Sequence, residues 1–187
     1  MNKKSRFKFW FLCSFCIIFL CVSMTYRGIQ DDTFYIIKLG EYISKNGIDL
    51  LDHYSIFNGL SYTYPHWLFD LILYYIFHSF SYFGVYVFVI IGYIFLISIV
   101  FYATYKLSNN LFISLFFSFM CIVILNPYVN ARAQIISLPL FILEVYFINR
   151  LIDSGRDRYI FYLCISSLII ANVHGTAWLF YFILFLP

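Results

Sequence analysis

The stretch FGVYVFVIIGYIFLISIVFYATY, residues 83–105, contains no charged residue. About 20 predominantly apolar residues in a helix cross the hydrocarbon core of a bilayer, and this stretch is long enough. Over all 187 residues, 63% are hydrophobic and 11% are charged, whereas a soluble domain is about one quarter charged. Similar apolar runs cover residues 9–24, 111–125, 135–148 and 159–171. The sequence therefore predicts an all-α polytopic helical membrane protein with about five to six transmembrane helices.

Basic residues orient the first apolar run. It follows Lys3, Lys4, Arg6 and Lys8, and no small-residue cleavage pattern comes after it. A basic start before an uncleaved apolar core is typical of a signal anchor. Because positive charges stay on the cytoplasmic side, we expect a multi-pass protein of the cell membrane with its N-terminus in the cytoplasm.

Residues 66–82 are apolar enough to be a further span, but the distribution of charge argues against it. If this segment spanned, Lys106 and the arginines of residues 150–158 would lie outside. If it lies flat in the outer interface, these basic residues all lie inside. A polar stripe also recurs every four residues, as on an interfacial helix: His66, Asp70, Tyr74 and His78. A spanning helix that faces a cavity would carry the same stripe, so that arrangement stays open.

The flat arrangement makes residues 26–82 an outer loop with two juxtamembrane helices. Asp31 or Asp32 can N-cap the first helix, which would run to about Lys45. Pro65 suits the first turn of the second helix.

No internal repeat, linker or second domain is visible, so residues 1–187 are expected to form a single transmembrane module. The apolar run after Gly175 is short for a span when it reaches Pro187. We therefore expect the module to be incomplete.

Polar groups that packing does not explain gather on the outer side in this topology. A carboxylate there can act as a general base or bind a divalent metal. Arginine presents a planar fork that fits phosphate, and histidine can carry a proton near neutral pH. This combination suits an enzyme that acts on a lipid phosphate in the membrane, with no nucleic acid as partner. The candidates are Asp31, Asp32, His53, His66 and Asp70 in the loop, Arg132 in the outer turn, and His174 after the fifth run.

Structural interpretations of the same residues stay open. The adjacent aspartates can serve only as helix caps, and His66 and Asp70 only as an i,i+4 pair. Arg132 can simply reach lipid headgroups, and His174 can be a satisfied turn residue. Glu144, inside the fourth run, is a functional candidate because ionisable residues in spans are rare, but a neutral packing role fits it equally.

Four phrases, in this order, resemble the GT-C class of membrane glycosyltransferases. The resemblance covers roughly residues 8–180 and includes an acidic residue just after the first span and a long first outer loop with two juxtamembrane helices. The phrases are DTFYIIKLGE (residues 32–41), HWLFD (66–70), ARAQ (131–134) and NVHG (172–175). Ala133 is a departure, because the third phrase usually has proline there.

Enzymes of this class use a polyprenyl-phosphate-linked sugar as donor. The resemblance implies that Asp32, or Asp31, deprotonates the hydroxyl of the acceptor, and that the anomeric centre inverts as the lipid phosphate leaves. It makes Arg132 and His174 candidates to hold that phosphate. Some members use a divalent metal and others do not, so the cofactor stays open.

Two other functions stay open. A transporter-like protein would place polar residues opposite each other within the spans, and only Glu144 fits that pattern. A non-catalytic or truncated polytopic membrane protein would fit the short last run.

Overall fold

The computed structural model of the chain describes residues 3–25, 30–57 and 59–185. Within these residues the secondary structure is helical, and the β-structure is one isolated bridge between Leu51 and Ser61. The chain is therefore an all-α helical membrane protein, as predicted. The helices are α1 (Lys3–Met24), α2 (Asp31–Asn46), α3 (Trp67–Ser108), α4 (Leu111–Leu125), the short 3-10 helix η1 (Asn126–Tyr128), α5 (Gln134–Ser154), α6 (Arg158–Val173) and α7 (Gly175–Ile183).

Within the described residues, three helical segments are long and apolar enough to cross a membrane. They are α3, the segment Leu111–Tyr128 that joins α4 and η1, and α5. Two shorter apolar segments, Ser14–Ser23 in α1 and all of α6, accompany them. These five helical segments overlap the five apolar runs from which the sequence predicts spans, and three of them are long enough to cross a bilayer.

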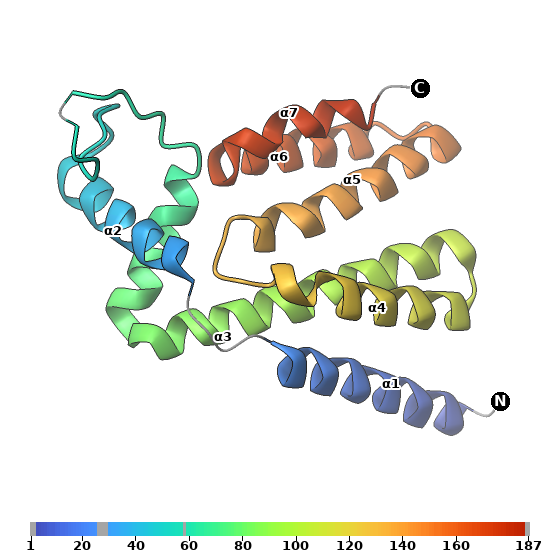
Figure 1. Ribbon diagram of the computed structural model, residues 1–187. Helices are drawn as coiled ribbons and strands as arrows, with labels where there is room; N and C mark the ends of the chain where they lie inside the picture. The colour runs from blue at the N-terminus through green and yellow to red at the C-terminus, as the bar shows by residue number, and fades with distance from the viewer. Residues whose placement is uncertain (1–2, 26–29, 58, 186–187) are drawn as a thin grey trace.

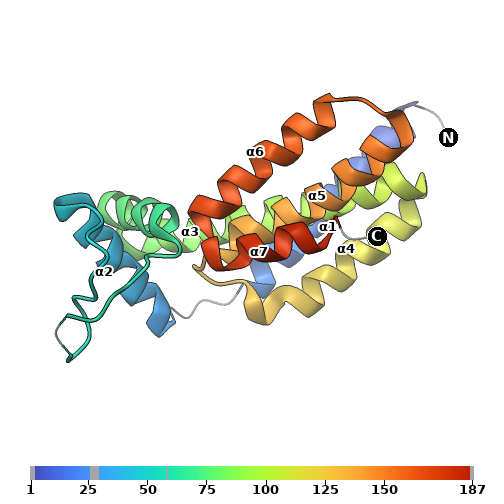
Figure 2. The ribbon, with the colours of Figure 1, turned by 90° about the horizontal axis from the view of Figure 1, so that it is seen from above.

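The apolar helices lie side by side and form a bundle in which successive helices run in opposite directions (Figure 1). α2 and the loop that follows it lie together at one end of this bundle, as Figures 1 and 2 both show. We call this end the α2 end. The turn between η1 and α5 and the elbow between α6 and α7 also lie there. The α3–α4 and α5–α6 connections lie at the opposite end (Figure 1).

A kink at Ser81 divides α3 into two parts. Ser81 has φ 55° and ψ −157°, which no α-helix accommodates. The part before the kink lies across the α2 end beside α2, and the part after it runs along the bundle (Figure 1). Residues 66–82 therefore do not run the length of the bundle. They form a separate helical arm at the α2 end, which meets the span at the kink, and their predicted juxtamembrane position stays a prediction.

Large apolar side chains are exposed around the bundle. Phe83 is 74% exposed, Phe112 79% and Phe161 63%. A soluble protein does not expose so many aromatic rings, whereas lipid tails solvate them well. The buried core lies between α1, α2, α3, α4 and α5 and includes Ile36 and Ile37 of α2 against Phe69 and Leu73 of α3. α2 is thus held by the core of the bundle.

Gly40 lets α2 approach α3 closely. A Cβ atom built on Gly40 would lie 2.1 Å from the backbone oxygen of Asp70 and 2.7 Å from Cβ of Tyr74. Neither atom is the end of a flexible side chain, so only a shift of one helix could relieve the overlap.

We expect Gly40→Ala to displace α2 and to destabilise the protein. Overpacking of a tight contact costs about 1–3 kcal/mol, which would lower the midpoint of thermal unfolding in nanodiscs. Ser44→Ala, at an exposed position of the same helix, is the matched control. Equal midpoints for Gly40→Ala and the wild type would show that α2 does not dock on α3 through Gly40.

Candidate functional site

A small pocket at the α2 end brings together four of the residues that the sequence singled out. Its volume is about 150 Å³. Its lining comes from α2, from the residue immediately before α3, from the turn before α5, and from the elbow between α6 and α7. The lining residues are Asp32, Tyr35, Ile36, His66, Arg132, Ala133, Gln134 and His174.

Asp32 and Arg132 form an ion pair across this pocket, although they are 100 positions apart in the chain. Nη2 of Arg132 donates to Oδ2 of Asp32. The side chains are 57% and 40% exposed, so solvent screens the pair and it adds little to stability. Nε of Arg132 is buried and has no hydrogen-bond partner in the described part of the chain. The ion pair with Asp32 thus uses only part of the donor set of the guanidinium.

The turn before α5 fixes the backbone of Arg132. The amide of Arg132 donates to the carbonyl of Asn130 at 2.8 Å, and its own carbonyl accepts from the amide of Ile135 at 3.0 Å. Ala131 and Ala133 on either side are buried. Two small buried neighbours and a closed turn thus hold the arginine at the edge of the pocket.

The prediction that Asp31 or Asp32 caps α2 is wrong. Gln30 is the N-cap residue, and no side chain makes a capping hydrogen bond there. Both aspartates lie in the first turn, where the positive end of the helix dipole favours carboxylates. Asp31 is exposed and does not line the pocket. Asp32 is therefore the carboxylate that faces the site.

His66 and Asp70 form a second acid–base pair behind the pocket. Nδ1 of His66 lies 3.7 Å from Oδ1 of Asp70, too far for a hydrogen bond but close enough for an ion pair. Asp70 is fully buried. It belongs to the part of α3 before the kink, outside the segment that runs along the bundle. Burial raises the pKa of Asp70, and the nearby imidazole of His66 opposes that rise.

The elbow between α6 and α7 delivers His174. The amide of Gly175 donates to the carbonyl of Pro65 at 2.7 Å and so ties the elbow to the start of α3. Nδ1 of His174 lies 2.9 Å from Oγ of Ser137 on α5. The rings of His174 and His66 lie with their centroids 6.1 Å apart. Burial, and then the charge of His66, lower the pKa of His174, which favours its neutral form.

His53 and Glu144 lie apart from the pocket lining. Nε2 of His53 is 2.6 Å from Oδ2 of Asp49 in the loop after α2. Glu144 is fully buried in α5, ten residues beyond Gln134, which is about 15 Å along a helix. Its carboxylate oxygens have no hydrogen-bond partner among the described residues. Within the same residues, no group of three His, Cys, Asp or Glu side chains could hold a metal ion.

Asp49 organises the loop after α2. Its carboxylate accepts hydrogen bonds from the hydroxyl groups of Tyr42 at 2.6 Å and Tyr64 at 3.2 Å. The ring of His53 stacks on Tyr42 with centroids 4.3 Å apart. The hydrogen bond from Tyr42 is the main cause that lowers the pKa of Asp49 below its usual range. One carboxylate thus joins α2 to the start of α3.

We expect this loop to be ordered at neutral pH and to open only in strong acid. Because the pKa of Asp49 is lower in the folded state, its contribution is complete above the unfolded value of about 3.9 and is lost as the pH falls through the folded value. Asp49→Asn should therefore raise amide hydrogen exchange in residues 47–57 at pH 7. Asp153→Asn, exposed at the opposite end, should leave that exchange unchanged. If amide exchange in residues 47–57 were equally slow in Asp49→Asn and Asp153→Asn, Asp49 would not hold this loop in place.

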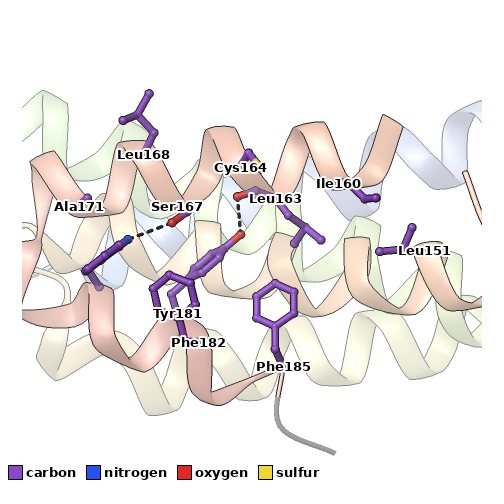
Figure 3. A pocket seen from close by; sticks show the side chains of 11 residues that line it. Leu151, Ile160, Leu163, Cys164, Ser167, Leu168, Ala171, Tyr181, Phe182 and Phe185 are labelled. Atoms are coloured by element: carbon purple, nitrogen blue, oxygen red, sulfur yellow. Dashed lines mark hydrogen bonds between the residues drawn. The ribbon is translucent and has the colours of Figure 1, made fainter. Parts of the chain in front are cut away.

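A second hollow, of about 470 Å³, lies along α6 and α7 (Figure 3). Its polar side chains are already paired. Nε1 of Trp178 donates to Oγ of Ser167 at 2.9 Å, and the hydroxyl of Tyr181 donates to the carbonyl of Leu163 at 2.7 Å. The remaining lining is mostly apolar, so this groove offers contacts for hydrocarbon and no charged group.

Three polar residues of the site were not singled out from the sequence. Tyr35 follows Asp32 by three residues and so shares its helix face, a signal that was available. Gln134 stands next to the arginine turn and also lines the pocket. Ser137 gave no local signal, because only the fold brings it to His174.

Comparisons of the chain with protein family models, with curated proteins and with solved structures found no match. A proposal about the function of this chain must therefore rest on the chemistry of the pocket and on the resemblance of the four sequence phrases described above.

Proposed function

We propose that the chain is a membrane glycosyltransferase, or a module of one, that transfers a sugar from a polyprenyl-phosphate donor to an acceptor hydroxyl at the outer membrane face. The observation that carries the proposal is the meeting of Asp32, Arg132, His66 and His174 in one pocket at the α2 end. These side chains supply a base, a phosphate fork and two proton carriers.

Each side chain has a role in the transfer. Asp32 takes the proton of the acceptor hydroxyl, whose oxygen attacks the anomeric carbon. The bond from that carbon to the phosphate oxygen breaks, and the lipid phosphate leaves with the electron pair. Arg132 holds the phosphate through its planar fork. His174, favoured in its neutral form, donates a hydrogen bond to it.

The ion pair between Asp32 and Arg132 gives the site a resting state. A carboxylate bound to a guanidinium is a weaker base than a free one. A donor phosphate would compete with Asp32 for Arg132 and so release the carboxylate when the substrate arrives. Both side chains are partly exposed, so the exchange of partners breaks no buried contact.

The position of the pocket suits a lipid-linked substrate. Its lining residues come from the end of the bundle where α2 lies, so a phosphate could reach the pocket while an isoprenoid tail lay along the apolar helices. Figure 1 shows α2 at this end. The divalent metal that some members of the class use stays a prediction for this chain.

The orientation in the cell membrane follows from the basic residues. Lys106, in the last turn of α3, and Arg156, in the α5–α6 connection, lie at the end of the bundle opposite the pocket, which we place in the cytoplasm with the N-terminus. We expect a reporter fused after Lys106 to be cytoplasmic and one fused after Asn130 to be external. Alkaline phosphatase activity, which needs export, reads out both fusions. The reverse pattern would put the pocket on the cytoplasmic face.

The test of the proposed function is sugar transfer by the full-length protein in nanodiscs. A set of labelled polyprenyl-phosphate sugars is offered with a crude acceptor fraction from the same membranes, and nucleotide-linked sugars serve as the comparison. We expect transfer from a polyprenyl-phosphate donor and none from a nucleotide donor. Transfer from nucleotide sugars alone, or from no donor in the set, would refute the assignment.

A further inference from the structure

The ion pair formed by His66 and Asp70 lacks the hydrogen bonds that usually accompany a buried ion pair. Both carboxylate oxygens of Asp70 are buried without a hydrogen bond, and Nδ1 of His66 is buried without one as well. A buried carboxylate without donors is costly unless it holds a proton or faces a cation. His66, with 28% of its side chain exposed, is the group that links this buried carboxylate to the pocket.

Titratable and charged groups lie on two sides of the pair formed by His66 and Asp70. On the pocket side, His66 meets the ring of His174 and shares the lining with Asp32 and Arg132. On the buried side, Asp70 interacts with the neutral phenols Tyr35 and Tyr62. Neither phenol makes a hydrogen bond to the carboxylate. Among the described residues, His66 is the basic group within ion-pair distance of Asp70.

We propose that His66 is a catalytic acid that protonates the departing phosphate, and that Asp70 is the positioning residue that holds His66 in its protonated form. The inference rests on the proposed function and adds a second proton transfer to it. Nδ1 faces Asp70, and Nε2 is the nitrogen available to a phosphate in the pocket.

The proton transfers balance. As the bond between the anomeric carbon and the phosphate oxygen breaks, that oxygen gains an electron pair and takes the proton from Nε2 of His66. Asp32 meanwhile gains the proton of the acceptor hydroxyl. Afterwards Asp32 releases one proton to solvent and His66 takes one up, which restores both groups. The site thus has its base on α2 and its acid at the start of α3.

The two histidines of the pocket have different partners at Nδ1, and the mechanism requires this difference. His66 has a carboxylate behind its Nδ1, whereas His174 has the hydroxyl of Ser137 at that position. Only the carboxylate stabilises an imidazolium. His66 therefore supplies a proton and His174 supplies a neutral hydrogen bond.

The first experiment needs no turnover. The full-length protein with ¹³C-labelled histidine is titrated in nanodiscs by NMR, as wild type and as Asp70→Asn. His66→Gln and His78→Gln assign the ring signals, and His78 is the exposed control. We expect the pH midpoint of the His66 signal to fall in Asp70→Asn, because the variant removes the carboxylate that lies beside Nδ1. Equal midpoints in the two proteins would overturn the proposal, even if the enzyme transfers sugar.

A second arm adds isoprenyl monophosphate, with isoprenyl alcohol as the control for the tail. We expect the phosphate alone to move the His66 signal. Where transfer is measurable, Asp70→Asn should lose more rate at pH 8 than at pH 6, because less His66 is protonated there. A uniform loss across this range would mean that Asp70 acts only on the fold. Absence of transfer in the wild type refutes the proposed function separately, because the titration still tests the pair.

Discussion

Arg132→Lys is expected to keep the fold and to lose most of the affinity for phosphate. Lysine preserves the charge but not the planar fork, so it binds phosphate as a single point. Loss of one preorganised donor to a developing oxyanion costs about 10²–10³-fold in rate. The measurement is binding of isoprenyl monophosphate in nanodiscs, together with kcat/KM for transfer.

Stability separates a functional loss at Arg132 from a folding defect. The ion pair with Asp32 is partly exposed at both ends, and such pairs contribute about 0–1 kcal/mol. The midpoint of unfolding should therefore stay close to that of the wild type. Arg156→Lys, in the connection at the opposite end, is the matched control. If Arg132→Lys bound phosphate with the affinity of the wild type, the assignment of Arg132 as the residue that holds the donor phosphate would be wrong.

The membrane fold could be predicted because it depends on composition. Long uncharged runs such as residues 83–105 leave only a helix as a spanning structure, since every backbone polar group must be satisfied within the segment. The face of α2 was also predictable, because Ile36, Leu39 and Ile43 recur with helical spacing and all three are buried. The end of α2 at Gly47, with φ 80°, follows from the freedom of glycine.

Details that depend on tertiary contacts could not be predicted. The two helical parts of α3 meet at a kink at Ser81, and this residue is neither proline nor glycine. The N-cap is Gln30, and Asp32 pairs with Arg132 from the first turn of α2, a contact that only the fold reveals. The role of Gly40 became visible only with the backbone of Asp70 beside it.

The candidate site was predictable as a set of residue types and not as a geometry. The positive-inside tendency placed Asp32, His66, Arg132 and His174 on one side, because basic residues mark the other side. They meet in one pocket because hydrogen bonds fix the elbow between α6 and α7 and the turn before α5. One of these bonds runs from the amide of Gly175 to the carbonyl of Pro65. The pairing of His174 with Ser137 on another helix has no counterpart in the sequence.

Asp32→Asn is expected to have the largest effect of all on transfer. Asparagine has the same shape and can still accept a hydrogen bond from Arg132, but it cannot take a proton from the acceptor. A positioned general base contributes about 10²–10⁴-fold, so the rate should fall by that factor while donor binding persists. Asp31→Asn, one residue earlier and outside the pocket lining, should keep most of the activity.

The most direct measurement is therefore the rate of sugar transfer from a polyprenyl-phosphate donor by the wild type, Asp31→Asn and Asp32→Asn in nanodiscs. The base assigned to Asp32 predicts near-complete loss in Asp32→Asn and a rate close to wild type in Asp31→Asn. Undiminished transfer in Asp32→Asn would contradict it.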